Sequence, residues 1–305
     1  MDQAKSIKSA VENNLNKLDK TKGILFSALA AFIYGFTPIL GKLSYLEGSN
    51  FMSLTFYRNL LSIPVIFIFL KYKNIDLRIS KQEIKKLALL SSFGPTLTAL
   101  TLYSAYNYIS VGMTTTIHYI YPVMVAAICI LVYKEKISKS KIAALVLSTL
   151  GVAMFFEGSF SLAGVILALL SAVFFTAYIL YLDKSGLNIM YPFKITFYIA
   201  AFSSIYLFIA GIISSNLVFS MSIKGWIYSG LVAFFASFLA NTFVPIGVKY
   251  VGPTVTSIVG MVEPITSVLL GILILSEPLT LKNAIACILI VVGVLTVTVV
   301  KDNKE

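Results

Sequence analysis

The sequence predicts an all-α integral membrane protein with ten transmembrane helices, arranged as two inverted-topology repeats of five helices. Three observations lead to this fold class: the composition, the succession of apolar segments and an internal repeat. Of the 305 residues, 58% are hydrophobic and 12% are charged, and the mean hydropathy is +0.90. Soluble domains carry about 25% charged residues, so most of this chain is expected to lie in lipid.

Ten apolar segments have roughly the 20 residues that a helix needs to cross a bilayer. The fifth is short, and only tight turns around residues 108–110 and 250–253 separate the third from the fourth and the eighth from the ninth. We place the ten segments near 23–42, 51–70, 86–107, 110–132, 141–157, 160–181, 191–213, 224–249, 252–275 and 281–300.

Residues 1–22 precede the first apolar segment and are polar and basic. Apolar residues recur in them at helical spacing, which fits a short helix on the membrane surface, and a disordered basic tail fits equally well. Many apolar segments follow and no small-residue cleavage site is evident, so the first segment is not expected to be a cleaved signal peptide.

The two halves of the chain are related at a constant offset of 142 positions. In an apolar chain, matched Pro, Glu, Gly and Tyr residues in one register carry more weight than matched Leu or Ile. The sequence therefore divides into a basic segment (1–22), a first five-helix repeat (23–157), a second repeat (160–300) and a short tail (301–305). The matches between residues 108–151 and the corresponding stretch of the second half are Tyr108/Tyr250, Thr114/Thr256, Pro122/Pro264, Glu135/Glu277, Ala144/Ala286 and Gly151/Gly293.

The distribution of basic residues orients the chain. With ten spans, most of the 24 Lys and Arg residues fall on the side of the N-terminus, and Lys42, Lys224 and Lys282 fall opposite. The positive-inside rule then places both termini in the cytoplasm, and we expect the plasma membrane. Five spans per repeat is an odd number, so the second repeat enters from the opposite side. Such inverted repeats suit alternating access.

Several other classes of protein are disfavoured. The net charge of +11 does not indicate a nucleic-acid partner, because the lysines cluster between apolar segments. The two cysteines have no CxxC-like companion and there is one histidine, which argues against a disulfide or a metal site. We find no P-loop, no HExxH motif and no paired acid–base groups. We therefore expect neither enzymatic activity nor a cofactor.

Three ionisable residues fall inside predicted spans: Arg58, His118 and Glu263. A charge in the bilayer interior costs on the order of 3 kcal/mol, so it needs a partner or a watery cavity. Glu263 precedes Pro264, which cannot bond the Gly260 carbonyl, so a kink with local room is expected there. Glu263 could bind a cationic group or carry a proton. The alternative is a structural ion pair with Arg58.

The other two ionisable residues have functional and structural interpretations as well. The Arg58 guanidinium could grip a carboxylate or phosphate, or could cap helix carbonyls. His118 shares a helical face with Thr114 and Tyr121 and titrates near neutral pH. That face could line a pathway, although a lone histidine is more often a satisfied interior residue.

Aromatic, polar and small residues complete the candidate site. Rings at mid-span would attract a cationic or aromatic solute, while packing is the default explanation for any single ring. Bending and close helix approach are expected at Gly35, Gly260, Pro122 and Pro264, which we assign to gating. The further candidates for binding substrate or protons are Tyr34, Tyr103, Tyr119, Tyr121, Tyr178, Asn59 and Asn241.

These motifs resemble the drug/metabolite transporter superfamily, and its EamA-type branch in particular. The resemblance covers residues 23–300 and rests on the segment 56–60 (FYRNL), on Glu263-Pro264, and on the helix-end segments 134–138 (KEKIS) and 276–280 (SEPLT). The family usually has Trp-Gly where this chain has Tyr34-Gly35, a departure that concerns the pocket wall and not the fold. Members of the family export amino acids, purines, drugs or other metabolites, and some import.

The resemblance implies a secondary active transporter of small metabolites that works by alternating access. We expect an amino-acid or related metabolite exporter, coupled to protons or working as an exchanger, because a zwitterion satisfies both Glu263 and Arg58. One alternative is an importer or exporter of organic cations or drugs. Another, of a different class, is a membrane enzyme or a lipid-handling protein that transports nothing. The expected partners are the metabolite, protons and membrane lipids, and both a monomer and a homodimer are compatible with the sequence.

Overall fold

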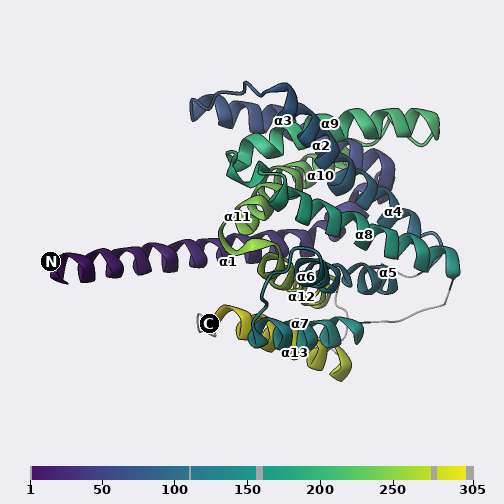
Figure 1. The fold of residues 1–305 in the computed structure, drawn as a ribbon. Helices are drawn as coiled ribbons and strands as arrows, with labels where there is room; N and C mark the ends of the chain where they lie inside the picture. Colours follow the sequence, from purple (N-terminus) through teal and green to yellow (C-terminus); the bar gives the residue numbers. More distant parts are fainter. Residues whose placement is uncertain (1, 110, 156–160, 276–279, 300–305) are drawn as a thin grey trace.

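The computed structural model describes residues 2–109, 111–155, 161–275 and 280–299, and every regular element in these ranges is a helix (Figure 1). Two elements, η1 and η3, are π-helical, and η2 is a short 3₁₀ turn. The elements are α1 (Asp2–Leu46), α2 (Phe51–Tyr72), α3 (Lys81–Ser91), η1 (Ser92–Thr98), α4 (Ala99–Ala105), α5 (Val111–His118), α6 (Tyr121–Leu131), α7 (Lys139–Ala153), α8 (Leu162–Lys184), η2 (Leu187–Ile189), α9 (Pro192–Ile213), α10 (Ile223–Val232), η3 (Ala233–Ala240), α11 (Asn241–Gly260), α12 (Glu263–Leu275) and α13 (Leu281–Val299).

By length and composition, seven segments of the described chain can cross a membrane. The predicted third span is divided among α3, η1 and α4, and α7 has only 15 residues, so neither reaches that standard. The predicted eighth and ninth spans lie in one helical segment of 48 residues, Ile223–Leu270. Gly252 interrupts this segment with a φ of 78°, a left-handed conformation that glycine adopts without a Cβ clash.

Helix α1 runs without interruption from the basic N-terminal segment into the first apolar segment, over 45 residues. Its N-terminal part projects beyond the bundle in Figure 1. The structure therefore shows neither a separate surface helix nor a disordered tail for residues 2–22. The only proline in this helix is Pro38, so nothing in the first half of α1 removes a backbone donor or breaks the helix.

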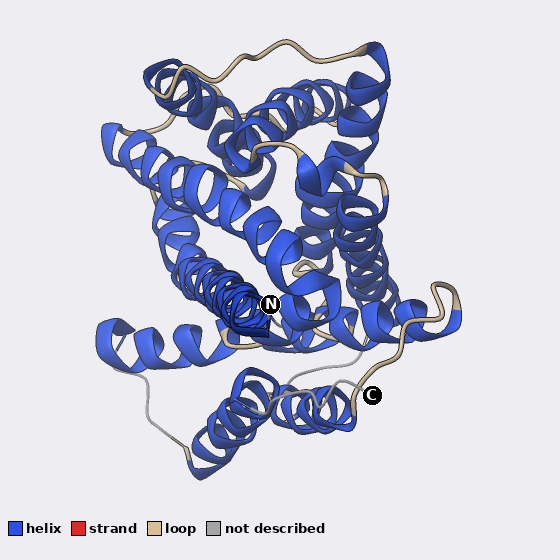
Figure 2. Ribbon diagram, turned by 60° about the vertical axis from the view of Figure 1, so that its left-hand side comes forward, coloured by secondary structure: helices blue, strands red, loops and turns tan. Residues whose placement is uncertain are grey.

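The first helix of each half packs on helices of the other half. Helix α1 lies along α11 and also contacts α10, η3 and α12, whereas α8 contacts η1, α4, α5 and α6. Helices α2 and α9 pack together, and α7 lies beside α13 at one edge of the bundle (Figures 1 and 2). The two halves of the sequence are therefore interlocked in space.

The contact between α7 and α13 depends on two matching glycines. A Cβ added at Gly151 would lie 2.7 Å from the Ala286 carbonyl oxygen, and one at Gly293 would lie 2.8 Å from the Ala144 carbonyl oxygen. Both distances are too short for a real side chain, so only glycine allows the helices to approach this closely. The contact is reciprocal. Gly151 meets Ala286, and the residues that match these two at the offset of 142, Gly293 and Ala144, also meet.

Backbone irregularities also fall at matching positions in the two halves. The π-helical segments are Ser92–Thr98 and Ala233–Ala240, and 142 added to the first range gives 234–240. A turn at residues 119–120 separates α5 from α6, and a turn at 261–262 separates α11 from α12. Single π-helical turns and discontinuous helices are frequent at functional sites.

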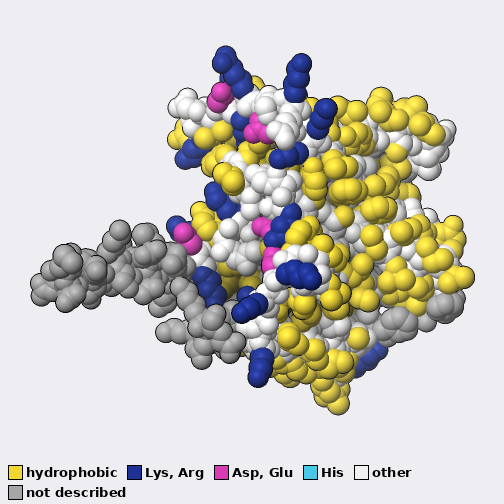
Figure 3. All heavy atoms as spheres, viewed as in Figure 1, with side chains coloured by type: hydrophobic (Ala, Val, Ile, Leu, Met, Phe, Trp, Pro, Cys, Tyr) yellow, Lys and Arg dark blue, Asp and Glu magenta, His cyan; other side chains and the backbone are white. Residues whose placement is uncertain are grey.

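The surface is mostly apolar outside one basic region. Figure 3 shows hydrophobic side chains over much of the visible face, while Lys and Arg gather mainly on the side toward which α1 projects. Many large apolar side chains are exposed, among them Leu150 at 54%, Ile212 at 50% and Leu295 at 53%. A helix with apolar residues on all sides is suited to contact with lipid rather than water.

Candidate functional site

Tyr121 and Glu263, which match at the offset of 142, each begin a helix directly after a break. Tyr121 is the first residue of α6 and Glu263 the first of α12. Pro122 and Pro264 follow them at positions where a helix has no use for the missing N–H group. The break lies at residues 261–262, just after the predicted Gly260 kink. The Glu263 side chain therefore lies at the N-terminal, positive end of the α12 dipole.

Aromatic side chains from α1, α5, α6 and α8, and from the turn between α5 and α6, meet in a group that we term the central aromatic cluster. Its members are Tyr34, His118, Tyr119, Tyr121, Phe175 and Tyr178. The ring centroids of Tyr121 and Phe175 are 4.7 Å apart, and those of Phe175 and Tyr178 are 5.6 Å apart. Tyr34 on α1 lies within electrostatic range of Tyr178 and Tyr121. Five of these six residues, all except Phe175, were predicted from the sequence as candidates.

Glu263 lies beside this cluster and is half-buried. Its carboxylate interacts electrostatically with Tyr34, Tyr106, Tyr119 and Tyr121. The buried Tyr119 hydroxyl has no hydrogen-bond partner of normal geometry. Four phenol groups therefore lie within electrostatic range of the carboxylate, and the Tyr119 hydroxyl is available to donate a hydrogen bond to it or to a solute bound next to it.

Arg58 and Glu263 form no ion pair in the part of the chain that the structure describes. The Arg58 Nε atom is buried and has no hydrogen-bond partner. The guanidinium interacts electrostatically with Tyr34 and Tyr45, so Tyr34 lies within range of both the positive and the negative group. The structural ion pair weighed as an alternative role for Glu263 is absent in this structure.

Helix α1 is held closely to the starts of both α11 and α12. The Tyr34 hydroxyl donates to Asn241 Oδ1 over 2.5 Å, and the Ser267 hydroxyl donates to the Gly35 carbonyl over 2.8 Å. A Cβ at Gly35 would lie 2.6 Å from the Glu263 carbonyl oxygen. Gly35 is therefore required for the close approach of α1 to the break that holds Glu263.

Tyr121 makes a similar close contact across the molecule with Gly260. A Cβ at Gly260 would lie 2.6 Å from the Tyr121 hydroxyl oxygen. Tyr178 lies in the same manner over Gly94 of η1, where an added Cβ would be 2.6 Å from the ring. Gly260 and Gly94 thus make room for the rings of Tyr121 and Tyr178, which come from other helices.

Two predicted residues lie in other surroundings. Asn59 is fully buried, and its amide donates to the Thr55 carbonyl of its own helix over 2.8 Å, so its contacts are those of a helix-packing residue. Tyr103 packs against Tyr106, with ring centroids 5.6 Å apart, and interacts electrostatically with Tyr45. The structure therefore groups Tyr103 with the surroundings of Arg58 rather than with the stacked rings.

Sequence reasoning missed four residues of this region: Phe175, Tyr106, Tyr45 and Ser171. The Ser171 hydroxyl lies 2.9 Å from His118 Nδ1. Helical spacing could have indicated Phe175, because it lies three positions before Tyr178 on α8. No local pattern distinguishes Ser171 or Tyr106 from the other polar residues of these helices. The contacts that place them here come from distant segments: Ser171 with His118, and Tyr106 with Tyr45 and Glu263.

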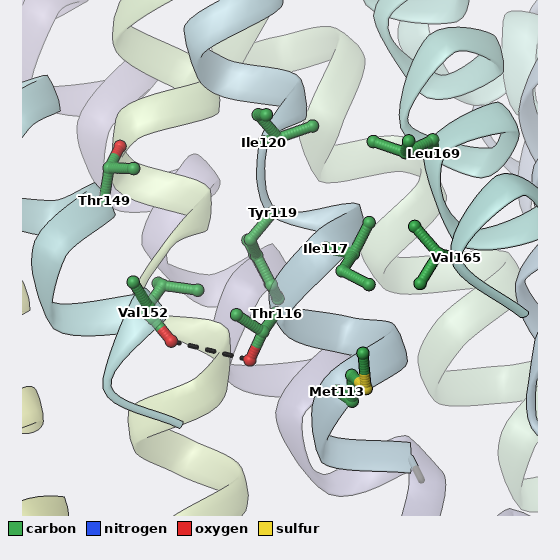
Figure 4. Close-up of a pocket in the computed structure, with 10 residues that line it drawn as sticks. Met113, Thr116, Ile117, Tyr119, Ile120, Thr149, Val152, Val165 and Leu169 are labelled. Atoms are coloured by element: carbon green, nitrogen blue, oxygen red, sulfur yellow. Dashed lines mark hydrogen bonds between the residues drawn. The ribbon is translucent and has the colours of Figure 1, made fainter. Parts of the chain in front are cut away.

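A mainly apolar cavity of about 370 Å³ lies next to the cluster, between α5, α7 and α8 (Figure 4). Its lining includes Met113, Thr149, Val165 and Leu169, and also Tyr119, which belongs to the cluster as well. The Thr116 hydroxyl on its wall donates to the Val152 carbonyl over 3.5 Å. This cavity offers few polar groups and is distinct from the surroundings of Glu263.

Comparisons with known proteins are consistent with this architecture. No curated protein sequence matches the chain. Among solved structures, 29 chains match, including one titled only "Crystal structure of protein"; it aligns with a TM-score of 0.78 at 15% identity over 91% of this chain and 97% of its own. That similarity shows a shared fold. The model of the EamA-like transporter family matches twice, over residues 21–156 and 162–299. The chain therefore belongs to the EamA-like transporter family and is a multi-pass membrane transporter built from two repeats.

Proposed function

We propose that this protein is a secondary active transporter that works by alternating access through ten spans in two inverted repeats, 23–157 and 160–300. The seven membrane-competent segments support this count when Gly252 divides Ile223–Leu270 into two spans. The run from α3 to α4 and the shorter α7 supply the remaining two. Residues 1–22 and 301–305 then flank the repeats.

The inverted relation of the repeats is supported by reciprocal contacts. In a two-fold arrangement, residue i of one unit meets residue j of the other, and j meets i. The contacts of Gly151 with Ala286 and of Gly293 with Ala144 have this form. The matching π-helical segments and helix breaks agree with it. An approximate two-fold axis between α7 and α13 is the simplest geometry that gives such pairs.

Both termini are proposed to lie in the cytoplasm and the protein in the plasma membrane. The N-terminal part of α1 and the end of α13 lie on the same side of the bundle in Figure 1, and the basic side chains of Figure 3 gather there. Reporter fusions in the segment from Lys71 to Lys86 provide the test. A cytoplasmic signal is expected, and an external signal would reverse the orientation.

The proposed substrate is an amino acid or a related zwitterion, moved outward in exchange for protons or for another solute. One observation carries this proposal: Glu263 begins α12 at a break inside the bundle, and Arg58 does not neutralise it. Tyr34 lies within electrostatic range of both groups. A solute with an ammonium and a carboxylate group would satisfy the two charges at once, which removes the cost of each unpaired charge.

Organic cations form a second candidate class, and a specific observation favours them. The rings of the central aromatic cluster lie beside one carboxylate, and aromatic faces attract cations, most strongly where water is excluded. A cation would use Glu263 and the rings but would leave Arg58 without a partner. The two classes therefore differ in their dependence on Arg58.

Thermal unfolding of the purified protein with amino acids, amines and nucleosides, at two pH values, tests the function. A solute that binds the folded state stabilises it by mass action, by about 2.7 kcal/mol at 100 times its Kd, and so raises the unfolding temperature. We expect a zwitterion to stabilise the wild type but not Glu263→Gln. Glu83→Gln is the matched control, because glutamine also closes the capping box that Glu83 forms with Ser80.

The outcomes separate the candidates. A zwitterion whose effect is lost in both Glu263→Gln and Arg58→Gln supports an amino-acid transporter. A cation whose effect survives Arg58→Gln supports the second class. Unchanged ligand stabilisation in Glu263→Gln, with its pH dependence intact, would contradict the proposed site.

A further inference from the structure

His118 has two ring nitrogens in different surroundings. Nδ1 lies 2.9 Å from the Ser171 hydroxyl oxygen on α8. Ser171 is fully buried, and its hydroxyl donates to the Ala168 carbonyl over 2.6 Å. A serine hydroxyl has a single proton, which is used in this bond, so the oxygen can only accept from His118. Nδ1 must therefore carry a proton.

The other nitrogen, Nε2, is then unprotonated in the neutral ring. No described residue forms a hydrogen bond with Nε2, and the His118 side chain is half-buried. Its ring lies among those of Tyr119, Tyr121 and Phe175, at centroid distances of 5.9, 5.4 and 5.5 Å. Nε2, with its free lone pair, therefore lies within the central aromatic cluster.

Two features next to the ring would interact favourably with a proton bound to it. His118 is the last residue of α5, where the negative end of the helix dipole stabilises a cation. The neighbouring aromatic faces attract an imidazolium ion. The matching position in the second half is Gly260, so only the first half has an imidazole at this position.

We propose that Ser171 holds His118 in the Nδ1–H tautomer, so that Nε2 is a proton-accepting position in the central aromatic cluster, separate from Glu263. The step adds one proton from water at Nε2 and later returns it, and no other bond changes. Ser171 acts here as a positioning residue. This inference rests on the proposed function for its use in transport, but the tautomer and the access to Nε2 are measurable without a substrate.

Four other titratable groups face this region. Tyr119 and Tyr121 follow His118 in the chain, Tyr178 lies on α8, and Glu263 on α12 interacts with both Tyr119 and Tyr121.

The chain has one histidine, which makes the tautomer directly observable. Protein labelled with ¹⁵N-histidine and purified through a histidine-free tag gives imidazole signals from His118 alone. Two-bond ¹H–¹⁵N correlation spectra above neutral pH are expected to show a protonated Nδ1 and an unprotonated Nε2. Ser171→Ala should convert this single tautomer into a mixture, and Ser171→Thr should restore it.

Ser204→Ala is the matched control, because Ser204 is also buried and also donates to a carbonyl of its own helix, that of Ala200, over 2.7 Å. Its spectrum should equal that of the wild type. A wild-type spectrum with the proton on Nε2 would overturn the proposal. A tautomer in Ser171→Ala that is identical to the wild type would do so as well, even if all variants fold normally.

Access to Nε2 is tested with diethyl pyrocarbonate, which acylates an unprotonated imidazole nitrogen. Mass spectrometry of the folded protein should show modification at His118, at a rate that falls as acid protonates the ring. Modification only after denaturation would overturn the accepting role. A failure of Glu263→Gln to change ligand binding would remove the proposed function and leave both of these results intact.

Discussion

Substituting Gly260 by alanine places one methyl group against the hydroxyl of Tyr121, a residue of the central aromatic cluster. The added Cβ would lie 2.6 Å from that oxygen, whereas ordinary contacts begin at 3.4 Å. The ring or the helix must therefore shift by about 0.8 Å. Tyr121 is only 5% exposed and its ring lies 4.7 Å from that of Phe175, so little space is available for the shift.

The expected cost follows from this confinement. Overpacking of a well-packed interior by one methylene costs about 1–3 kcal/mol. Part of this cost should appear in ligand binding, because the displaced ring belongs to the proposed site. Since about 1.4 kcal/mol corresponds to a tenfold change in Kd, Gly260→Ala should weaken ligand binding about tenfold or more while the protein still folds.

A double-mutant cycle isolates the contact. Tyr121→Phe removes the hydroxyl oxygen that the new methyl group would meet, so Gly260→Ala should cost much less in that background. The coupling between the two substitutions should fall within about 0.5–3 kcal/mol, the range for residues in contact. Thermal unfolding of the four proteins, with and without the stabilising solute, gives the coupling in stability and in binding separately.

Two results would refute the reasoning. The first is Gly260→Ala with the stability and ligand binding of the wild type, which would mean that Tyr121 does not lie over Gly260. The second is strictly additive effects in the cycle, which would mean that the methyl group acts through another neighbour.

Three further predictions concern helix packing and one exposed carboxylate. Tyr34→Phe removes the donor to the amide oxygen of α11 and should destabilise the protein by about 1–3 kcal/mol, seen as a lower unfolding temperature; an unchanged temperature would show that water replaces the hydroxyl. Gly151→Ala and Gly293→Ala meet backbone atoms at similar distances and should destabilise by similar amounts, so a strongly unequal pair would count against reciprocal packing. Hydrogen bonds from the Ser80 backbone and side chain lower the pKa of Glu83. A depressed folded-state pKa adds stability at neutral pH that disappears as the pH falls through it; Ser80→Ala should raise this pKa toward its usual range and shift that loss to higher pH, as ¹³C carboxyl titration would show.

Much of the backbone could be predicted because its signals are local. Apolar length predicts helices in lipid, and a proline two residues after a turn predicts where a helix restarts. The π-helical segments were not predicted, since they extend an otherwise regular pattern by one residue per turn and leave no mark in composition. The number of candidate spans also differs, because α7 is shorter and the third apolar segment less regular than its hydropathy indicates.

The candidate site could likewise be predicted only in part. Intramembrane charges are costly, so Arg58, His118 and Glu263 could be selected from the sequence as candidates. Whether Arg58 pairs with Glu263 could not be decided from the sequence, because the two lie 205 positions apart. Their distance in space depends on how the helices between α2 and α12 pack. Asn59 was an equally good candidate by type, and only the structure shows that its amide bonds its own helix.

The sequence by itself determined the membrane environment, the repeat at 142 positions and the family, because hydropathy and residue register are properties of the linear chain. Only the tertiary structure decided which side chains meet. Tyr121 over Gly260, Tyr34 on Asn241 and Ser171 on His118 each join segments more than 50 positions apart. These contacts depend on how interlocked helices rotate and approach each other, and that is set by the sum of many packing interactions rather than by any local pattern.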